Sequence, residues 1–334
     1  MRLSYAQNLE DYHLDLMFAG QADGTYVDVG GGHPVADNVS FWFYLKGWRG
    51  LIVEPQAVLA DAYRHIRPRD NVYCGLAGAS AGEADFHAVA GLHGLSSMVR
   101  AQAEGARQFG VGYTTQRMPM RRLDDLIGEA GLAKIDFLKI DVEGAEEQVL
   151  AGLDLGKIRP RVIVIESVNP TNPDGAAGPW EVPVTAAGYV HALFDGLNRF
   201  YVRTDERALA ARLPDKPMPW DAVDHLWDHG RAPHNSRHAD HELARVVERG
   251  VMAMLPGLEP QLLQAILSRG LGVQVSGSDQ LDPDIAGRLL GPAEFSGTEP
   301  VAADLASLMA SDRFRAALGR IACFYDGGHI VDEV

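Results

Sequence analysis

Apolar, strand-like segments alternate with helical segments through residues 25–203, and this alternation constrains the fold more than any other feature. The strand-like segments are 25–29, 49–55, 71–78, 83–89, 135–144, 161–167, 189–195 and 198–204. Helical segments are expected at about 4–20, from Pro34 to Tyr44, and at 58–66, 121–132, 145–153 and 180–187. This order predicts a mostly parallel sheet with helices on both faces, that is, an α/β, Rossmann-like domain.

The composition and the predicted secondary structure of the chain change near residue 212. A Pro-rich segment, LPDKPMPWD, begins at Leu213, and the residues after 242 resemble short helices without strand pairs. We therefore predict a first domain at 1–212, then a linker and a small, mainly helical C-terminal module at 213–334. Such a module could capture an acceptor or form a homo-oligomer.

Charge and composition exclude several classes. The formal net charge is -15, and so acidic a surface repels a phosphate backbone, which makes nucleic acid a poor partner. The two cysteines, Cys74 and Cys323, cannot build a disulfide framework. Since no run of about 18 apolar residues is present and the N-terminus lacks an apolar signal, we expect a cytoplasmic protein without membrane insertion.

The first strand runs into the glycine-rich turn VDVGGGHP. Asp28 stands on the strand, and Gly30, Gly31 and Gly32 follow, which allows a nucleoside ligand to approach the backbone closely. Glu54 ends the second strand, 26 residues after Asp28, where an acid can accept hydrogen bonds from ribose hydroxyls. The spacing suits adenosyl and NAD ligands alike, but the turn lacks the G-x-G-x-x-G register of a pyrophosphate site.

A second motif, FLKIDVEGAEEQVLAG, spans residues 137–152. Asp141 should lie at the carboxyl end of its strand, where open α/β sheets bind their ligands. Asp141 and Glu143 could instead simply cap the following helix. The presence of the first motif favours the ligand site.

These motifs together resemble the FkbM family of methyltransferases. The resemblance extends in order from about residue 4 to 205 through YVDVGGGHP, GWRGLIVEP, LSS, FLKIDVEGAEEQVLAG, IES and FDGLNRFYV. It implies a class I methyltransferase fold, for which a parallel sheet ending in an antiparallel hairpin is typical. It also implies S-adenosylmethionine as the donor and a hydroxyl oxygen as the usual acceptor, often on a sugar or a natural product.

The resemblance implies roles for individual residues. Asp28, Gly30 and Gly32 would hold the methionine part of the donor, and Glu54 its ribose. Gln7 and Asp11 resemble a family segment that folds over the donor, although they could simply form a solvated helix face. The predicted donor site comprises Gln7, Asp28, Gly30, Gly31, Gly32, Glu54, Pro55 and Asp141.

A sugar hydroxyl is a poor nucleophile at neutral pH, so a base or a metal must help it. Asp141, Glu166 and Asn169 end neighbouring strands and could share one Mg²⁺ through oxygen ligands. The predicted catalytic residues are Asp141, His33 and His191, and Asp195 is a further candidate base.

The leading hypothesis is an O-methyltransferase that acts on a hydroxyl of a sugar, glycan or glycosylated metabolite. The alternative is a catalytically silent Rossmann-like binding module that serves as a platform for partners. A weaker rival is a nicotinamide-dependent oxidoreductase. Donor binding with turnover on a hydroxylated acceptor would separate the first from the other two.

Overall fold

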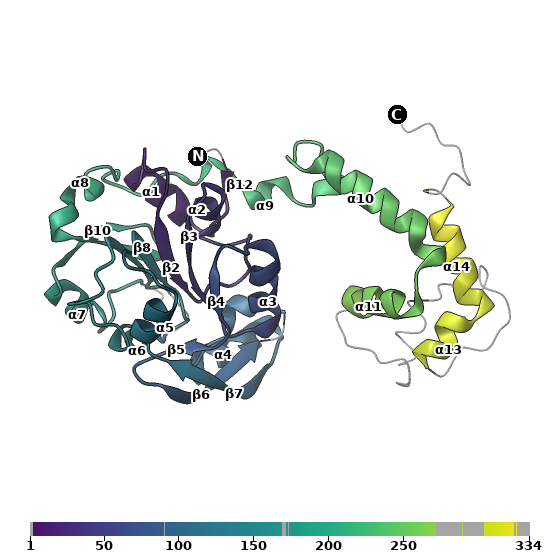
Figure 1. Ribbon diagram of the computed structural model, residues 1–334, viewed down its shortest axis with the longest axis horizontal. Helices are drawn as coiled ribbons and strands as arrows, with labels where there is room; N and C mark the ends of the chain where they lie inside the picture. Colours follow the sequence, from purple (N-terminus) through teal and green to yellow (C-terminus); the bar gives the residue numbers. More distant parts are fainter. Residues whose placement is uncertain are drawn as a thin grey trace. The chain divides into compact units, whose positions relative to one another are not determined.

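The computed structural model describes residues 3–89, 91–168, 172, 174–271, 289, 304–323 and 325. The chain divides into two compact units, Met1–Asp228 and His229–Val334. The first unit contains the strands of a large sheet, and the second is helical where it is described (Figure 1). Within the described residues, no helix has both the length and the apolar character needed to cross a membrane.

The central sheet has seven strands in the order β10-β11-β9-β8-β2-β3-β4. Neighbouring strands from β4 to β9 are parallel, whereas β11 runs antiparallel to β9, and β10 runs antiparallel to β11. The α/β, Rossmann-like fold of the class I methyltransferase type is therefore confirmed, including its closing hairpin. The strands are β2 (Thr25–Val29), β3 (Arg49–Val53), β4 (Asn71–Tyr73), β8 (Phe137–Ile140), β9 (Val162–Glu166), β10 (Tyr189–Phe194) and β11 (Asn198–Arg203).

The chain starts the sheet in its middle. It moves outward from β2 through β3 to β4, and later returns to build β8 and β9 on the other side of β2. The strand order thus reverses between β2 and β8. In open α/β sheets, ligands bind at the carboxyl ends of the strands at such a reversal.

Both faces of the sheet are buried, as expected for parallel strands. Val27 and Val29 face one apolar core, and Tyr26 between them faces the other, because side chains alternate along a strand. The first core is closed by α5 (Leu123–Glu129), α6 (Glu146–Ala151) and α7 (Glu181–Ala186), and the second by α1 (Glu10–Met17), α2 (Phe41–Leu45), α3 (Ala57–Ile66) and α8 (Arg207–Ala210).

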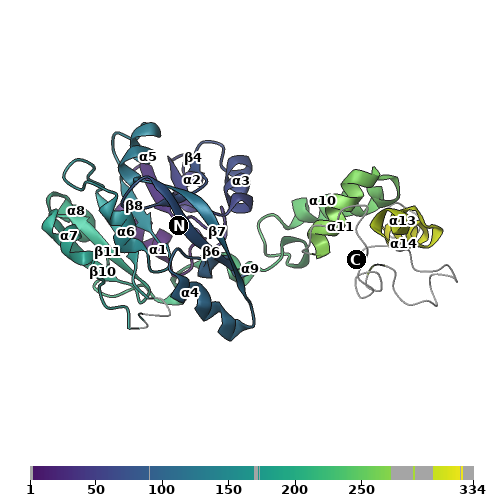
Figure 2. The same ribbon diagram turned by 90° about the horizontal axis from the view of Figure 1, so that it is seen from below.

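A second, three-stranded sheet with the order β5-β7-β6 was not predicted as such. It consists of β5 (Leu76–Ala77), β6 (Gly82–Val89) and β7 (Tyr113–Arg121), and α4 (Arg100–Gly105) lies beside β6 and β7 (Figures 1 and 2). The single strand predicted at 71–78 is divided between the two sheets, since β4 pairs with β3 and β5 pairs with β7.

The helix expected from Pro34 was wrong, because helix α2 begins only at Phe41. Asp37 has a left-handed backbone with φ 52°, and the side chain of Asn38 donates a hydrogen bond to the carbonyl oxygen of Gly31 (2.9 Å). This segment therefore braces the glycine turn as a loop. The first helix is likewise shorter than the expected 4–20.

The division between the units also falls later than the expected 212, because the following residues pack on the first unit. Strand β12 (Asp224–His225) pairs in parallel with β1 (Leu3–Ser4). The indole N–H of Trp227 donates to Asp37 (2.7 Å). These contacts attach the residues that follow the Pro-rich segment to the α/β unit.

The second unit has its own apolar core. Leu255, Leu263, Leu305, Phe314 and Leu318 are among its buried members. They come from the segment 255–263 and from the last two helices. The helices are α10 (His241–Met254), α11 (Pro260–Leu271), α13 (Leu305–Ala310) and α14 (Asp312–Ala322) (Figure 2).

Candidate active site

A cavity of about 610 Å³ opens at the carboxyl ends of β2, β3 and β8 in the first unit. This position is the one that the reversal of strand order predicts. The predicted residues that line it are Gln7, Gly30, Gly31, Gly32, His33, Glu54, Pro55, Asp141 and Glu166. Sequence positions separated by more than 150 residues are thus brought to one site.

The three glycines form the floor of this cavity, and they are not equivalent. A Cβ atom on Gly30 would lie 1.7 Å from the carbonyl oxygen of Asp141, so β8 can approach the turn only if residue 30 is glycine. Gly32 has φ 59°, and a Cβ there would have nothing within 4 Å. Gly30 therefore allows the end of β8 to pack against the turn, whereas Gly32 leaves open space toward the cavity.

Buried polar groups form hydrogen bonds to the glycine turn on the side that faces the protein interior. The hydroxyl of Tyr63 donates to the carbonyl oxygen of Gly31 (2.7 Å), as does the side-chain amide of Asn38. Asp28 belongs to this layer: it is buried, accepts a hydrogen bond from the Ser40 hydroxyl (2.6 Å), and does not line the cavity. The side chain of Asp28 thus supports the turn from inside the protein, and a direct contact between Asp28 and the donor stays a prediction.

Glu54 connects the turn to the end of β3. One carboxylate oxygen accepts a hydrogen bond from the N–H of Gly32 (2.9 Å), and the other accepts from the N–H of Gln56 (2.7 Å). Burial raises the pKa of Glu54 to about 7. The carboxyl group is fixed at the cavity wall with lone pairs left for hydroxyl donors.

The N-terminal segment contributes Gln7 to the cavity, but not Asp11. Asp11 is buried, and it accepts hydrogen bonds from the hydroxyl of Ser4 (2.6 Å) and the N–H of Tyr5 (2.7 Å). Burial raises its pKa to about 7. Asp11 thus shapes the segment that carries Gln7 to the cavity.

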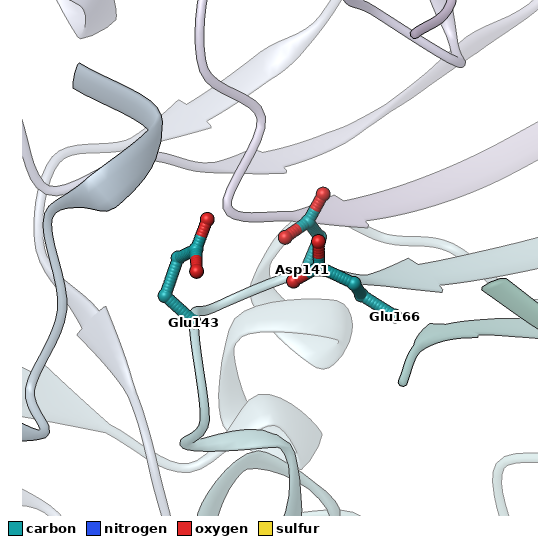
Figure 3. A group of neighbouring side chains, drawn as sticks. All are labelled: Asp141, Glu143 and Glu166. Carbon is teal, nitrogen blue, oxygen red and sulfur yellow. The ribbon is translucent and has the colours of Figure 1, made fainter. Parts of the chain in front are cut away.

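On the β8 side the cavity is bordered by Asp141, Glu143 and Glu166, which we call the carboxylate rim. One oxygen from each lies within 4.8 Å of the others, and Figure 3 shows the three groups gathered around the same space. Asn169, predicted with them, lies outside the described residues. Glu143 is the third carboxylate beside Asp141 and Glu166. Its position as the second acid of the DVEG motif was the signal in the sequence that could have identified it.

The rim has one buried cationic neighbour, Lys139, among the contacts described. Its ammonium group lies 2.7 Å from one Asp141 oxygen. Burial raises the pKa of Glu143 to about 8, and burial with the charges of Asp141 and Glu143 raises the pKa of Glu166 well above its ordinary value. Burial also opposes ionisation of Asp141, but the Lys139 ammonium outweighs it and lowers the pKa of Asp141.

Glu143 is held in a conformation that few non-glycine residues adopt. Its φ is 54°, and the Ser97 hydroxyl donates to its carbonyl oxygen (2.7 Å). The carboxylate of Glu146 accepts from the N–H of Gly144 (3.0 Å) and completes the turn. Backbone strain of this kind is frequent at functional sites.

The three predicted bases lie in different surroundings. His33 lines the cavity, but its Nδ1 accepts from the N–H groups of Val35 and Ala36 (3.2 and 3.0 Å), which leaves the proton on Nε2. His191 is exposed on the edge strand β10, away from the cavity lining. Asp195 lies at the hairpin turn and accepts from the N–H of Asn198, also outside the lining. None of the three presents a basic atom to the cavity in this arrangement.

The cavity has a further wall that the sequence motifs did not reveal. Trp227, 62% exposed, lines it from the end of the first unit, and His93 and Gln56 stand nearby, joined by a 2.7 Å hydrogen bond. The indole of Trp227 is bound to Asp37, 190 residues earlier in the chain, so no local sequence pattern predicts that Trp227 lies at the cavity.

The strand order, the closing hairpin and the cavity define a Rossmann-like domain of the class I methyltransferase type. Residues 28–191 match the model of the methyltransferase FkbM domain. The match includes the glycine turn, Glu54 and the carboxylate rim.

Two curated relatives match over shorter stretches. The AMB antimetabolite synthetase AmbE of Pseudomonas aeruginosa is 44% identical over 86 residues, which cover 25% of this chain and 3% of that protein. The 31-O-demethyl-FK506 methyltransferase FkbM of Streptomyces tacrolimicus is 37% identical over 94 residues, 27% of this chain and 34% of that protein. The chain thus spans a minor part of each relative.

Solved structures show weaker likeness. A TehB-like SAM-dependent methyltransferase from Corynebacterium glutamicum has a TM-score of 0.33 at 10% identity, covering 59% of this chain and 88% of its own. An O-methyltransferase from Bacillus cereus in complex with SAH has a TM-score of 0.31 at 13% identity, covering 60% and 83%. Scores this low add nothing to the assignment, which rests on the strand order and the family match.

Proposed function

We propose that this protein is an S-adenosylmethionine-dependent O-methyltransferase whose acceptor is a hydroxyl of a sugar, glycan or glycosylated metabolite. The observation that carries the proposal is the donor turn, by which we mean Gly30, Gly31, Gly32 and Glu54, at the reversal of the sheet in a segment that matches the FkbM domain.

The donor turn suits an adenosyl ligand. Gly32 faces open space, and Glu54 is fixed by two backbone N–H groups with acceptor capacity left for ribose hydroxyls. Pro55 and Ala77 add apolar surface to the lining, as an adenine ring needs, and Gln7 is also part of the lining. When bound, S-adenosylmethionine supplies an activated methyl group, so the protein has mainly to align the acceptor and receive its proton.

The acceptor would enter between the carboxylate rim and Trp227. The rim places carboxylate oxygens where a hydroxyl proton can be received. Trp227 offers an exposed indole whose N–H is already held by Asp37, which leaves its ring faces for the C–H face of a sugar. The name of the Streptomyces relative, a 31-O-demethyl-FK506 methyltransferase, also describes methyl transfer to oxygen.

The test uses the full chain. Isothermal titration measures binding of S-adenosylmethionine, and transfer of labelled methyl groups is then screened on glycosides and on non-sugar alcohols. We expect donor binding and turnover on a sugar, with a raised KM for Trp227→Ala. Trp220→Ala is the matched control, since Trp220 is also exposed but does not line the cavity.

Other outcomes would point elsewhere. Donor binding without turnover on any hydroxylated acceptor would favour the silent binding module. Binding of NAD and not of S-adenosylmethionine would favour an oxidoreductase. Turnover confined to non-sugar alcohols, with no effect of Trp227→Ala, would refute the sugar acceptor and leave the methyltransferase.

A further inference from the structure

We propose that the carboxylate rim is a binding site for one hard divalent cation, with Asp141, Glu143 and Glu166 as its protein ligands. Binding of the cation does not depend on the proposed function. Its role, to lower the pKa of an acceptor hydroxyl and fix the oxygen, rests on that function.

The first observation is the geometry of the ligand atoms. One carboxylate oxygen from each of the three residues lies within 4.8 Å of the other two. Oxygens coordinated to Mg²⁺ or Mn²⁺ stand about 2.0–2.2 Å from the ion, and those of Ca²⁺ somewhat farther, so the group can close on a common ion with small side-chain movements. All three ligands are carboxylates, the donors that such cations prefer.

The second observation is an orphaned oxygen. Glu166 is 6% exposed, and its buried Oε2 has no hydrogen-bond partner among the residues that the structure describes. The Glu166 carboxyl group also lies within hydrogen-bonding reach of Asp141. Two carboxylates this close need a proton or a cation between them, since a buried unpaired charge is costly.

The third observation is the imbalance of charge. The Lys139 ammonium contacts one oxygen of Asp141 (2.7 Å), and its positive charge also acts on Glu10 and Glu166. Among the described contacts, one positive charge thus faces several carboxylates, of which Glu10 and Glu166 are buried and Asp141 and Glu143 are half-buried. A divalent ion that enters from the cavity would neutralise the excess negative charge.

Access and preorganisation agree with this role. All three ligands line the cavity, so an ion can enter from solvent and retain water or an acceptor oxygen on its open side. The backbone of Glu143 has φ 54°, with its carbonyl oxygen bound by the Ser97 hydroxyl and the following N–H of Gly144 bound by Glu146. These bonds hold the backbone that carries the third carboxylate of the group.

The experiment measures Mn²⁺ binding to the full chain by electron paramagnetic resonance after dialysis against EDTA, with competition by Mg²⁺ and Ca²⁺. We expect one Mn²⁺ per chain below about 1 mM. Glu143→Gln and Glu166→Gln should each weaken binding by at least about tenfold. Glu147→Gln is the matched control, because Glu147 is an exposed acid of the adjacent helix α6, outside the cavity lining.

Absence of Mn²⁺ binding in the wild-type chain would overturn the proposal and leave a shared proton between Asp141 and Glu166. Binding that Glu143→Gln and Glu166→Gln weaken no more than Glu147→Gln would also overturn it. Thermal unfolding of each variant shows that the fold is retained. Donor titration in EDTA separates this proposal from the function, since donor binding without the ion would leave the methyltransferase standing.

Discussion

The donor turn and the carboxylate rim share one cavity but are built on opposite principles. The donor turn consists of three glycines and Glu54, and its backbone groups are bonded by Tyr63 and Asn38 at the Gly31 carbonyl and by Glu54 at the Gly32 N–H. The rim consists of carboxylates that crowd one another and share the charge of Lys139. The first region is complete without a ligand, whereas the second is short of positive charge.

This difference assigns donor binding to the turn and action on the acceptor to the rim. A satisfied, rigid turn holds a donor in place at little cost of reorganisation. An unbalanced group of acids is poised to take up a proton or a cation and so can act on an acceptor. The two regions touch where the carbonyl oxygen of Asp141 passes the Cα of Gly30.

The largest effect is expected at the rim. Lys139→Met should lower the free energy of unfolding by about 3–5 kcal/mol at pH 8, because it leaves buried carboxylates without their counter-charge. Chemical denaturation measures the loss, which should shrink at pH 5, where the raised pKa values of Glu143 and Glu166 let them protonate. An equal loss at both pH values would show that lost packing, and not charge, is responsible.

The next effect tests the contact between the regions. Gly30→Ala should destabilise the protein by about 2–4 kcal/mol and abolish donor binding, because its Cβ collides with Asp141 and φ is 80°. Gly32→Ala is the control: it meets no atom within 4 Å and bears only the left-handed penalty of about 1–2 kcal/mol. Similar losses of stability for the two variants would contradict the proposed packing role.

A smaller effect is expected at the wall of the donor turn. Glu54→Ala should weaken S-adenosylmethionine binding by about 2 kcal/mol, because a charged acceptor for two hydroxyls is lost. Isothermal titration gives the affinity, with Glu147→Gln as a matched control. An unchanged affinity would remove Glu54 from the donor site.

The smallest effect is a pH dependence of donor affinity. The pKa of Glu54 is raised to about 7, so its ionised form is depleted below pH 7. If the ionised form accepts the hydroxyls, affinity should rise about tenfold from pH 6 to pH 8 and then level off. Glu54→Gln, which cannot titrate, should abolish this rise. A rise that persists in Glu54→Gln would assign it to another group.

The strands of the central sheet were predictable because parallel strands buried on both faces read as continuous apolar runs, as in β9. Strand β7 was missed because most of its residues are exposed and polar. The donor turn was visible as a motif, but the burial of Asp28 was not, since its partner Ser40 precedes helix α2 and is itself bonded by Arg67, which follows helix α3. Trp227 depends on a contact with Asp37 across 190 residues, which no local pattern encodes.

The central claim is that the donor turn holds S-adenosylmethionine, and titration of the full chain with this compound in EDTA tests it most directly. The account predicts saturable binding at one site, lost in Gly30→Ala, weakened in Glu54→Ala and retained in Glu147→Gln. No binding by the wild-type chain, or equal binding by all four proteins, would contradict it.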